Sequence, residues 1–171
     1  MDKVTEERIK LLHPKIRAEV KALVEQANKA LTGNAQVRIV QGYRTFKEQD
    51  GLYALGRAVV NPNGKTAKRP MGSTVTRAKA GQSYHNYGLA IDFSLLIDGK
   101  TISWDTVKDY DGDLQSDWLE VVLIFTKSGY KWGKAFNDLP HLEKSFGKNW
   151  RDYLVLKNAG QVDKDGYVLI P

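Results

Sequence analysis

The stretch SYHNYGLAIDF, residues Ser83–Phe93, carries the pattern from which the fold can be predicted. From Gly88 onward, large apolar residues alternate with small or polar ones, a period of two that is typical of a half-buried β-strand. The large set is Leu89, Ile91, Phe93 and Leu95, and the other set is Gly88, Ala90, Asp92 and Ser94. Small residues around one carboxylate leave room for a ligand. We therefore predict that the Asp92 face of this strand is the floor of a site.

Composition limits the kinds of site that the chain can build. Its 171 residues suit one domain with a core large enough to need no disulfides. There is no cysteine, so a transition metal would have to be held by histidines and carboxylates. The three histidines are His13, His85 and His141. A net charge of +6 fits an anionic partner such as a cell-wall polymer. Basic residues do not recur together with stacking residues, so nucleic acid is not expected as a partner.

The N-terminal residues MDKVTEERIKLLHPK are charged and lack the apolar core of a signal peptide. No apolar run approaches the roughly 18 residues of a membrane span. We therefore expect a protein that is made in the cytoplasm and does not insert into a membrane.

Periodicity and turn residues predict helices followed by a strand-rich half, which indicates an α+β domain. Thr45 and Glu48 form a capping box at a helix start, and His13 stands at a capping position before Pro14. The predicted helices are Pro14 to Leu31, Thr45 to Gly56 and Asp117 to Gly129, and the strands are Gln36 to Val40 and Gly88 to Leu95. The remaining predictions are a long loop from Asn61 to Gln82, short strands in YKWG and PHLE, and a hairpin around Asp163 to Gly166.

Three residues form a candidate metal site. A catalytic zinc ion has three protein ligands and one open position, and His85, Asp92 and His141 supply suitable donors. His141 and Glu143 would share one face of a short strand. Spacing alone leaves a second interpretation open, because isolated histidines more often pack in a core or lie on a surface.

Several motifs together resemble the zinc D-Ala-D-Ala peptidase family, and most closely its L-alanyl-D-glutamate endopeptidase branch of Bacillus cell-wall hydrolases and phage endolysins. SYHNYGLAIDF matches the family motif S-x-H-x-x-G-x-A-x-D. The other matching stretches, between Leu12 and Glu143, are QGYRTFKEQDGLYALGR, SDWLEVV, WG and DLPHLE. The resemblance implies a hedgehog-like and DD-peptidase-like single α+β domain, with a small central antiparallel sheet flanked by helices.

The resemblance also implies roles for individual residues. His85, Asp92 and His141 would be the zinc ligands, and Asp138 would be the general base, with Glu143 as the local alternative. Arg44 matches the family's site arginine and would polarise the scissile carbonyl or stabilise the oxyanion. Its place directly after a strand favours this role over the alternative of an exposed loop arginine in an ion pair. Ser83 matches the motif's serine and would bind substrate, and Tyr84 would line the cleft or pack.

A second group of acidic residues has the spacing of a calcium loop. The stretch DYDGDLQSDWLE places oxygen-bearing side chains at positions 1, 3, 5, 7, 9 and 12 of such a loop. These residues are Asp109, Asp111, Asp113, Gln115, Asp117 and Glu120. Position 6, where calcium loops have glycine, is Leu114. A solvated acidic turn before the helix is the alternative interpretation.

The predicted organisation is a zinc peptidase domain at residues 1–143 and a C-terminal extension at residues 144–171 that packs on or beside it. The predicted function is hydrolysis of the peptidoglycan stem peptide between L-Ala and D-Glu by a monomer. The protein would act at the cell wall during phage or prophage release. The alternatives are D-Ala-D-Ala carboxypeptidase activity at the same zinc site, or a non-catalytic zinc or wall-binding module, which would need no base at Asp138.

Overall fold

The computed structural model of the protein describes residues 1–57 and 72–170. Residues 61–71 of the loop predicted between Asn61 and Gln82 lie outside the described residues, and residues 72–82 form turns without a helix or strand. Contacts group the chain into two compact units, one of residues 1–43 and 88–145 and the other of residues 44–87 and 146–171.

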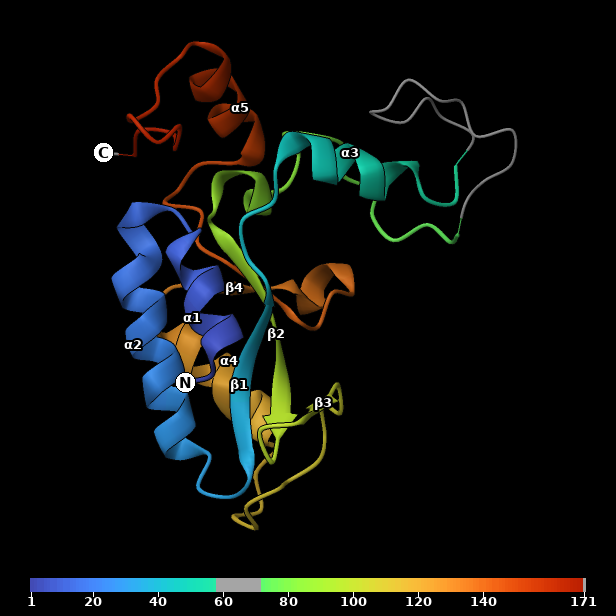
Figure 1. The fold of residues 1–171 in the computed structure, drawn as a ribbon, viewed down its shortest axis with the longest axis vertical. Coiled ribbons are helices and arrows are strands. Elements are labelled where there is room, and N and C mark those ends of the chain that lie inside the picture. The colour runs from blue at the N-terminus through green and yellow to red at the C-terminus, as the bar shows by residue number, and fades with distance from the viewer. Residues whose placement is uncertain (58–71, 171) are drawn as a thin grey trace. The chain divides into compact units, whose positions relative to one another are not determined.

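The first unit contains an antiparallel sheet. Its strands are β1 (Ala35–Gln41), β2 (Ala90–Ile97), β3 (Thr101–Ser103), β4 (Lys131–Trp132) and β5 (His141–Glu143). The order is β1-β2-β5-β4, and β3 also pairs with β2. Figure 1 shows β1 and β2 running side by side along most of their length. Because β2 pairs with both β1 and β5, residues distant in sequence meet across it.

Three helices of the first unit flank this sheet: α1 (Lys3–Lys10), α2 (Pro14–Ala30) and α4 (Asp117–Lys127). Both α1 and α2 contact β1, and α4 contacts α2 and β4. Nδ1 of His13 accepts a hydrogen bond from the Lys15 amide at 3.1 Å, which confirms the predicted cap of α2. A small antiparallel sheet with flanking helices confirms the predicted α+β class.

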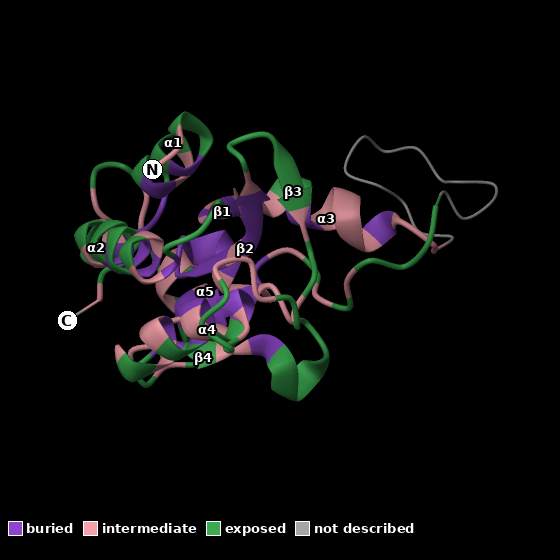
Figure 2. Ribbon diagram, turned by 90° about the horizontal axis from the view of Figure 1, so that it is seen from below, coloured by how far each residue is buried: buried purple, intermediate pink, exposed green. Residues whose placement is uncertain are grey.

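The core of the first unit lies along β2. Figure 2 shows buried residues along the strands and on the inner sides of the helices. Leu89, Ile91, Phe93 and Leu95 are fully buried, as the alternation predicts. The other face is also covered, since Ala90 and Ser94 are fully buried and Asp92 is partly exposed. The prediction of a half-buried strand was therefore wrong, because neighbouring elements cover β2 on both sides.

The second unit contains α3 (Phe46–Ala54), the short 3₁₀ helix η1 (Tyr84–Tyr87) and α5 (Trp150–Asn158). The predicted capping box of Thr45 and Glu48 opens α3. Tyr153 of α5 is fully buried, with its ring 5.3 Å from that of Tyr87 and 6.1 Å from that of Tyr84. The predicted hairpin near Asp163 is present as one antiparallel bridge between Val162 and Val168. Helices α1 and α5 were not predicted from the sequence.

No helix within residues 1–57 and 72–170 has the length and apolar character needed to cross a membrane.

Candidate metal and catalytic site

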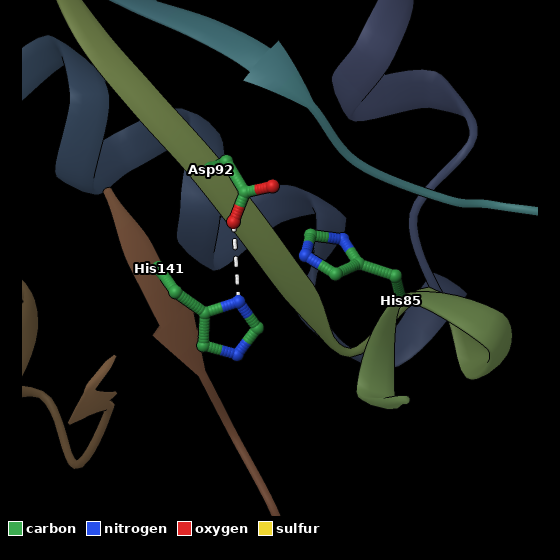
Figure 3. Close-up of side chains that lie close together, drawn as sticks. All are labelled: His85, Asp92 and His141. Atoms are coloured by element: carbon green, nitrogen blue, oxygen red, sulfur yellow. Dashed lines mark hydrogen bonds and ion pairs between the residues drawn. The ribbon is translucent and has the colours of Figure 1, made fainter. Parts of the chain in front are cut away.

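The pairing of β2 with β5 brings Asp92 opposite His141. These positions are 49 residues apart in sequence, and cross-strand partners on the same face lie close enough for their side chains to touch. Oδ1 of Asp92 and Nδ1 of His141 are 3.1 Å apart, as the dashed line in Figure 3 shows. Two of the three predicted zinc ligands are therefore held by strand register.

His85 is the third predicted ligand and comes from η1, shortly before β2 begins. Its side chain is buried, and its backbone carbonyl accepts a hydrogen bond from the Arg44 amide at 3.0 Å. One ligand atom from each of His85, Asp92 and His141 can be chosen so that all three lie within 4.8 Å of one another. Figure 3 draws these three side chains, with Asp92 on β2 and His141 on β5.

Both ring nitrogens of His141 have carboxylate partners. Nδ1 is close to Asp92, and Nε2 lies 2.9 Å from Oε2 of Glu143. Burial alone would lower the pKa of His141, but hydrogen bonds to Asp92 and Glu143 and their negative charges raise it to about 9. Glu143 follows His141 by two residues on the same strand face, and there it orients the ring from the side opposite Asp92.

The donor set of the three predicted ligands fits zinc. Two imidazoles and one carboxylate form a common catalytic zinc site with one position open. Two ligands of a tetrahedral zinc with bonds of about 2.0–2.1 Å lie about 3.3 Å apart. The 3.1 Å between Asp92 and His141 is close to that value. With Nδ1 directed at the metal position, the pairing of Nε2 with Glu143 would fix the ring and its tautomer.

Asp138 lies in the turn that precedes β5. The 3₁₀ helix η2 (Gly133–Phe136) ends at Asn137, which has a left-handed φ of 62°, and the Asp138 amide then donates to the Gly133 carbonyl at 3.0 Å. The Asp138 carbonyl accepts from the His141 amide at 3.2 Å, so Asp138 and His141 belong to one tight turn. Asp138 itself is exposed.

A pocket of about 320 Å³ in the first unit includes Asp138. The pocket combines the acid with two tryptophans and apolar turn residues. Its lining is Trp104, Thr106, Trp118, Asn137, Asp138, Leu139 and Pro140. Of the two candidate bases, only Asp138 lines this pocket, whereas Glu143 is engaged with His141.

Arg44 lies in the second unit, between β1 and α3. Its Nη1 donates to Oε1 of Gln49 at 2.9 Å, and its carbonyl accepts from Nδ2 of Asn86 at 2.9 Å. Gln49 is fully buried and donates through Nε2 to the Ala78 carbonyl at 2.7 Å. Sequence reasoning did not single out Gln49 or Asn86. One signal in the sequence could have identified Gln49. It is a polar amide on the buried face of a short helix that begins directly after Arg44.

The two predicted substrate-binding residues adjoin His85. Oγ of Ser83 accepts a hydrogen bond from the His85 amide at 3.3 Å. The Tyr84 hydroxyl donates to the Lys148 carbonyl at 2.8 Å. The hydroxyl of Tyr84 is therefore engaged within its own unit.

The acidic loop lies before α4 in the first unit. Two groups of carboxylates gather there and share Asp111: one contains Asp109 and Asp117, and the other contains Asp113 and Glu120. Gln115, the sixth predicted calcium ligand, donates through Nε2 to Oδ2 of Asp113.

Known proteins resemble this chain in sequence and in fold. The family profile for D-alanyl-D-alanine carboxypeptidase, of the M15 peptidases, matches residues 76–144. The peptidoglycan L-alanyl-D-glutamate endopeptidase CwlK of Bacillus subtilis (strain 168) is 46% identical over 136 residues, which cover 77% of this chain and 72% of CwlK. The crystal structure of the Serratia marcescens L-Ala D-Glu endopeptidase ChiX has the same fold, with a TM-score of 0.50 and 20% identity over 90% of this chain and 92% of ChiX. The M15 family consists of zinc peptidases, so a His-Asp-His metal site is an expected feature of its members. The match to the family profile and the identity to CwlK show that this chain belongs to the M15 peptidase family.

Proposed function

We propose that this chain is a zinc peptidase that hydrolyses the peptidoglycan stem peptide between L-Ala and D-Glu, acting at the cell wall. The observation that carries the proposal is the cluster of His85, Asp92 and His141. The bond cleaved is proposed from the 46% identity to CwlK, whose name specifies this endopeptidase. Action during phage release rests on the sequence resemblance alone and stays a prediction.

Each residue has a proposed task. His85, Asp92 and His141 would hold zinc, whose Lewis acidity activates water and polarises the scissile carbonyl. Asp138 would accept a proton on its carboxylate from the attacking water and pass it to the amine nitrogen of the leaving D-Glu. The position of Asp138 in the pocket supports this assignment, and the engagement of Glu143 with Nε2 of His141 argues against Glu143 as the base.

Arg44 would donate hydrogen bonds to the carbonyl oxygen of the scissile bond as negative charge develops on it. Its hydrogen bond to Gln49 and its backbone link to His85 support this role, because both limit the conformations that it can adopt. Ser83 and Tyr84 would contact the peptide beside His85.

D-Ala-D-Ala carboxypeptidase activity is the second candidate, since the matching family profile carries that description. The two activities leave different products. Mass spectrometry of purified muropeptides should show a new D-Glu amino terminus after incubation with the protein, and none with His141→Ala. Release of terminal D-Ala alone would replace the endopeptidase assignment with the carboxypeptidase one, and no cleavage of any muropeptide would contradict both.

A further inference from the structure

The pocket that contains Asp138 has a lining that the proposed chemistry leaves mostly unused. Its volume is about 320 Å³, which is within the range of sites for small ligands. Asp138 has a proposed catalytic task, but the two tryptophans of the lining, Trp104 and Trp118, have no task in that chemistry. All of the lining belongs to the first unit.

Trp104 is the exposed aromatic part of the lining. It follows β3 directly, and the pairing of Ser103 with Leu95 of β2 fixes the start of this segment. The Ser103 hydroxyl also accepts a hydrogen bond from the Tyr110 hydroxyl at 2.8 Å. Trp104 is nevertheless 53% exposed. An indole that is held beside a cavity with about half of its surface in water gains free energy when a ligand covers it.

Trp118 is the buried aromatic part of the lining. It is fully buried, and its ring lies against that of Phe93, the residue after Asp92, with centroids 4.3 Å apart. Its Nε1 is buried and has no hydrogen-bond partner in the described part of the chain. Buried N–H groups in proteins nearly always have a partner. An unpaired indole N–H on a residue that lines a pocket indicates that a ligand supplies an acceptor there.

The remaining wall is the turn that precedes β5 and leads into the predicted zinc ligand His141. Nε1 of Trp132 donates to the Leu139 carbonyl at 2.7 Å. The Phe93 amide of β2 donates to the Pro140 carbonyl at 3.1 Å. These bonds hold the turn against β4 and β2. The pocket therefore has fixed walls and adjoins the predicted metal ligands of β2 and β5.

The lining also limits the chemistry of a ligand. Among the described residues that line the pocket, Asp138 alone is charged, so no lysine or arginine balances it there. An ionised base at this position would repel a second carboxylate. Thr106, Asn137 and the indole of Trp118 are neutral and can donate to an amide carbonyl. Aromatic surface together with neutral donors suits an aliphatic chain that ends in an amide.

The proton transfer assigned to Asp138 decides which part of the substrate reaches this pocket. In the proposed function, Asp138 passes a proton to the amine nitrogen of the leaving D-Glu. That nitrogen must then lie within hydrogen-bonding distance of the Asp138 carboxylate, so the residue that carries it lies beside the pocket. D-Glu has two methylene groups and continues into the stem peptide through an amide of its side chain.

We propose that this pocket binds the leaving-group side of the stem peptide, and that Trp104 determines specificity by covering the methylene groups of D-Glu. The inference rests on the proposed function, which names the bond that is cleaved. The amide that follows D-Glu would accept from the neutral donors of the lining, with Nε1 of Trp118 as the buried donor. The acyl side of the substrate, which carries L-Ala, would lie outside this pocket.

The first measurement compares kcat and KM of the zinc-loaded full chain on acetyl-L-Ala–D-Glu–L-Lys, joined through the side-chain amide of D-Glu. Trp104→Ala should raise KM roughly tenfold, the effect of losing contact with two buried methylene groups, and should change kcat by less. Trp104→Phe should retain most of the binding because it keeps an aromatic face. Val107→Ala is the matched control: Val107 is 79% exposed, lies on the same segment outside the lining, and its loss should leave KM unchanged.

Product inhibition identifies the side of the substrate that the pocket binds. The leaving-side product D-Glu–L-Lys should inhibit competitively, and its inhibition constant should rise roughly tenfold in Trp104→Ala. The acyl-side product acetyl-L-Ala should inhibit the wild type and the variant equally. An unchanged Tm shows that Trp104→Ala is folded. If the Tm falls, Trp104→Leu keeps an apolar side chain and carries the same expectation against Trp104→Phe.

Three results separate this inference from the proposed function. Unchanged KM and inhibition constants in a folded Trp104→Ala would overturn the inference and leave the proposed cleavage intact. Weaker inhibition by acetyl-L-Ala, in place of D-Glu–L-Lys, would assign the pocket to the acyl side and would also overturn it. Failure of the wild-type protein to cleave the substrate would contradict the proposed function itself, and the inference would be lost with it.

Discussion

Nη1 of Arg44 donates a hydrogen bond to Oε1 of Gln49 at 2.9 Å, and Gln49 is fully buried. Because the other end of the Gln49 amide donates to the Ala78 carbonyl, the side chain is held at both ends. The guanidinium therefore rests on a fixed acceptor within its own unit. This makes Gln49 a positioning residue for the arginine that we assign to the oxyanion.

We expect Arg44→Ala to lower kcat roughly 10²–10³-fold, the usual cost of losing an oxyanion donor. Gln49→Met should lower kcat by up to about 10²-fold, because a small misplacement of a catalytic group can lower the rate by a similar factor. In the Arg44→Ala background, Gln49→Met should have little further effect on kcat. Equal losses of kcat from Gln49→Met in both backgrounds would show that Gln49 does not act through Arg44.

Asp138 and Glu143 can be separated by isosteric amides. Asp138→Asn should retain fold and zinc while turnover falls roughly 10²–10⁴-fold, the contribution of a positioned base. Glu143→Gln should lower turnover by at most roughly tenfold, because the amide oxygen can still accept a hydrogen bond from Nε2 of His141. Turnover of a defined stem peptide measures both. Near-normal turnover in Asp138→Asn with an inactive Glu143→Gln would reverse the assignment.

Zinc content tests the predicted ligands independently of activity. We expect one zinc per chain in the wild type and its loss in His85→Ala and His141→Ala, because three protein ligands are the minimum for a catalytic zinc site. Elemental analysis after dialysis gives the stoichiometry, and Asp138→Asn is the control that should keep its metal. Full zinc retention in both histidine variants would remove the site as proposed.

Gly88 joins η1 to β2, between the first two predicted ligands. Its φ is 68°, and a β-carbon there would lie 2.6 Å from the His13 amide nitrogen, whose hydrogen bond to the Gly88 carbonyl measures 2.9 Å. Gly129 has a φ of 84°, and a β-carbon there would have no atom within 4 Å. Gly88→Ala should therefore lower the free energy of unfolding more than Gly129→Ala, by roughly 1–3 kcal/mol. Chemical denaturation of both variants measures the free energy of unfolding. Equal losses of stability would mean that the strain of the positive φ accounts for the whole effect and that the close contact with His13 adds nothing.

Asp2 provides a pH-dependent contribution to stability. Burial would raise its pKa, but hydrogen bonds with Thr5 and the charge of Arg38, whose Nε lies 2.8 Å from Oδ1, lower it below the ordinary value. A carboxyl with a lowered folded-state pKa stabilises above its unfolded pKa, and the contribution disappears as pH falls through the folded value.

Asp2 is the N-cap of α1, and its Oδ1 accepts from the amides of Val4 and Thr5. Asp2→Ala should therefore lower the free energy of unfolding by about 1 kcal/mol at pH 7, the usual cost of losing an N-cap. The difference from wild type should shrink between pH 7 and an acidic pH that protonates the carboxyl in both states, because the contribution is lost as the pH falls through the lowered folded-state pKa. Urea unfolding at both pH values measures the effect, with Glu6→Gln, an exposed acid in the first turn of α1, as the control. A difference that does not change with pH would contradict the assigned role of the carboxylate.

Local sequence was sufficient for elements whose signals lie within a few residues. The cap at His13, the capping box of Thr45 and Glu48, and the helix after Ser116 are all present. Helix α1 was missed because contacts distant in sequence support it: the Thr5 hydroxyl accepts from the Ile39 amide at 3.1 Å, and Asp2 pairs with Arg38. Helix α5 was missed for a similar reason, since Tyr153 is buried against Tyr84 and Tyr87.

The sequence by itself determined which residues could bind a metal, because donor types and the motif around His85 and Asp92 are properties of the chain. Only the tertiary structure decided how these donors and their neighbours are used. Strand pairing sets Asp92 against His141, and the two-residue period of β5 directs Glu143 to the far nitrogen of the same ring. It also decided that two oxygens of the acidic loop are buried without a partner among the described residues. Burial and contact between residues distant in sequence depend on how strands and helices pack, and no local pattern encodes them.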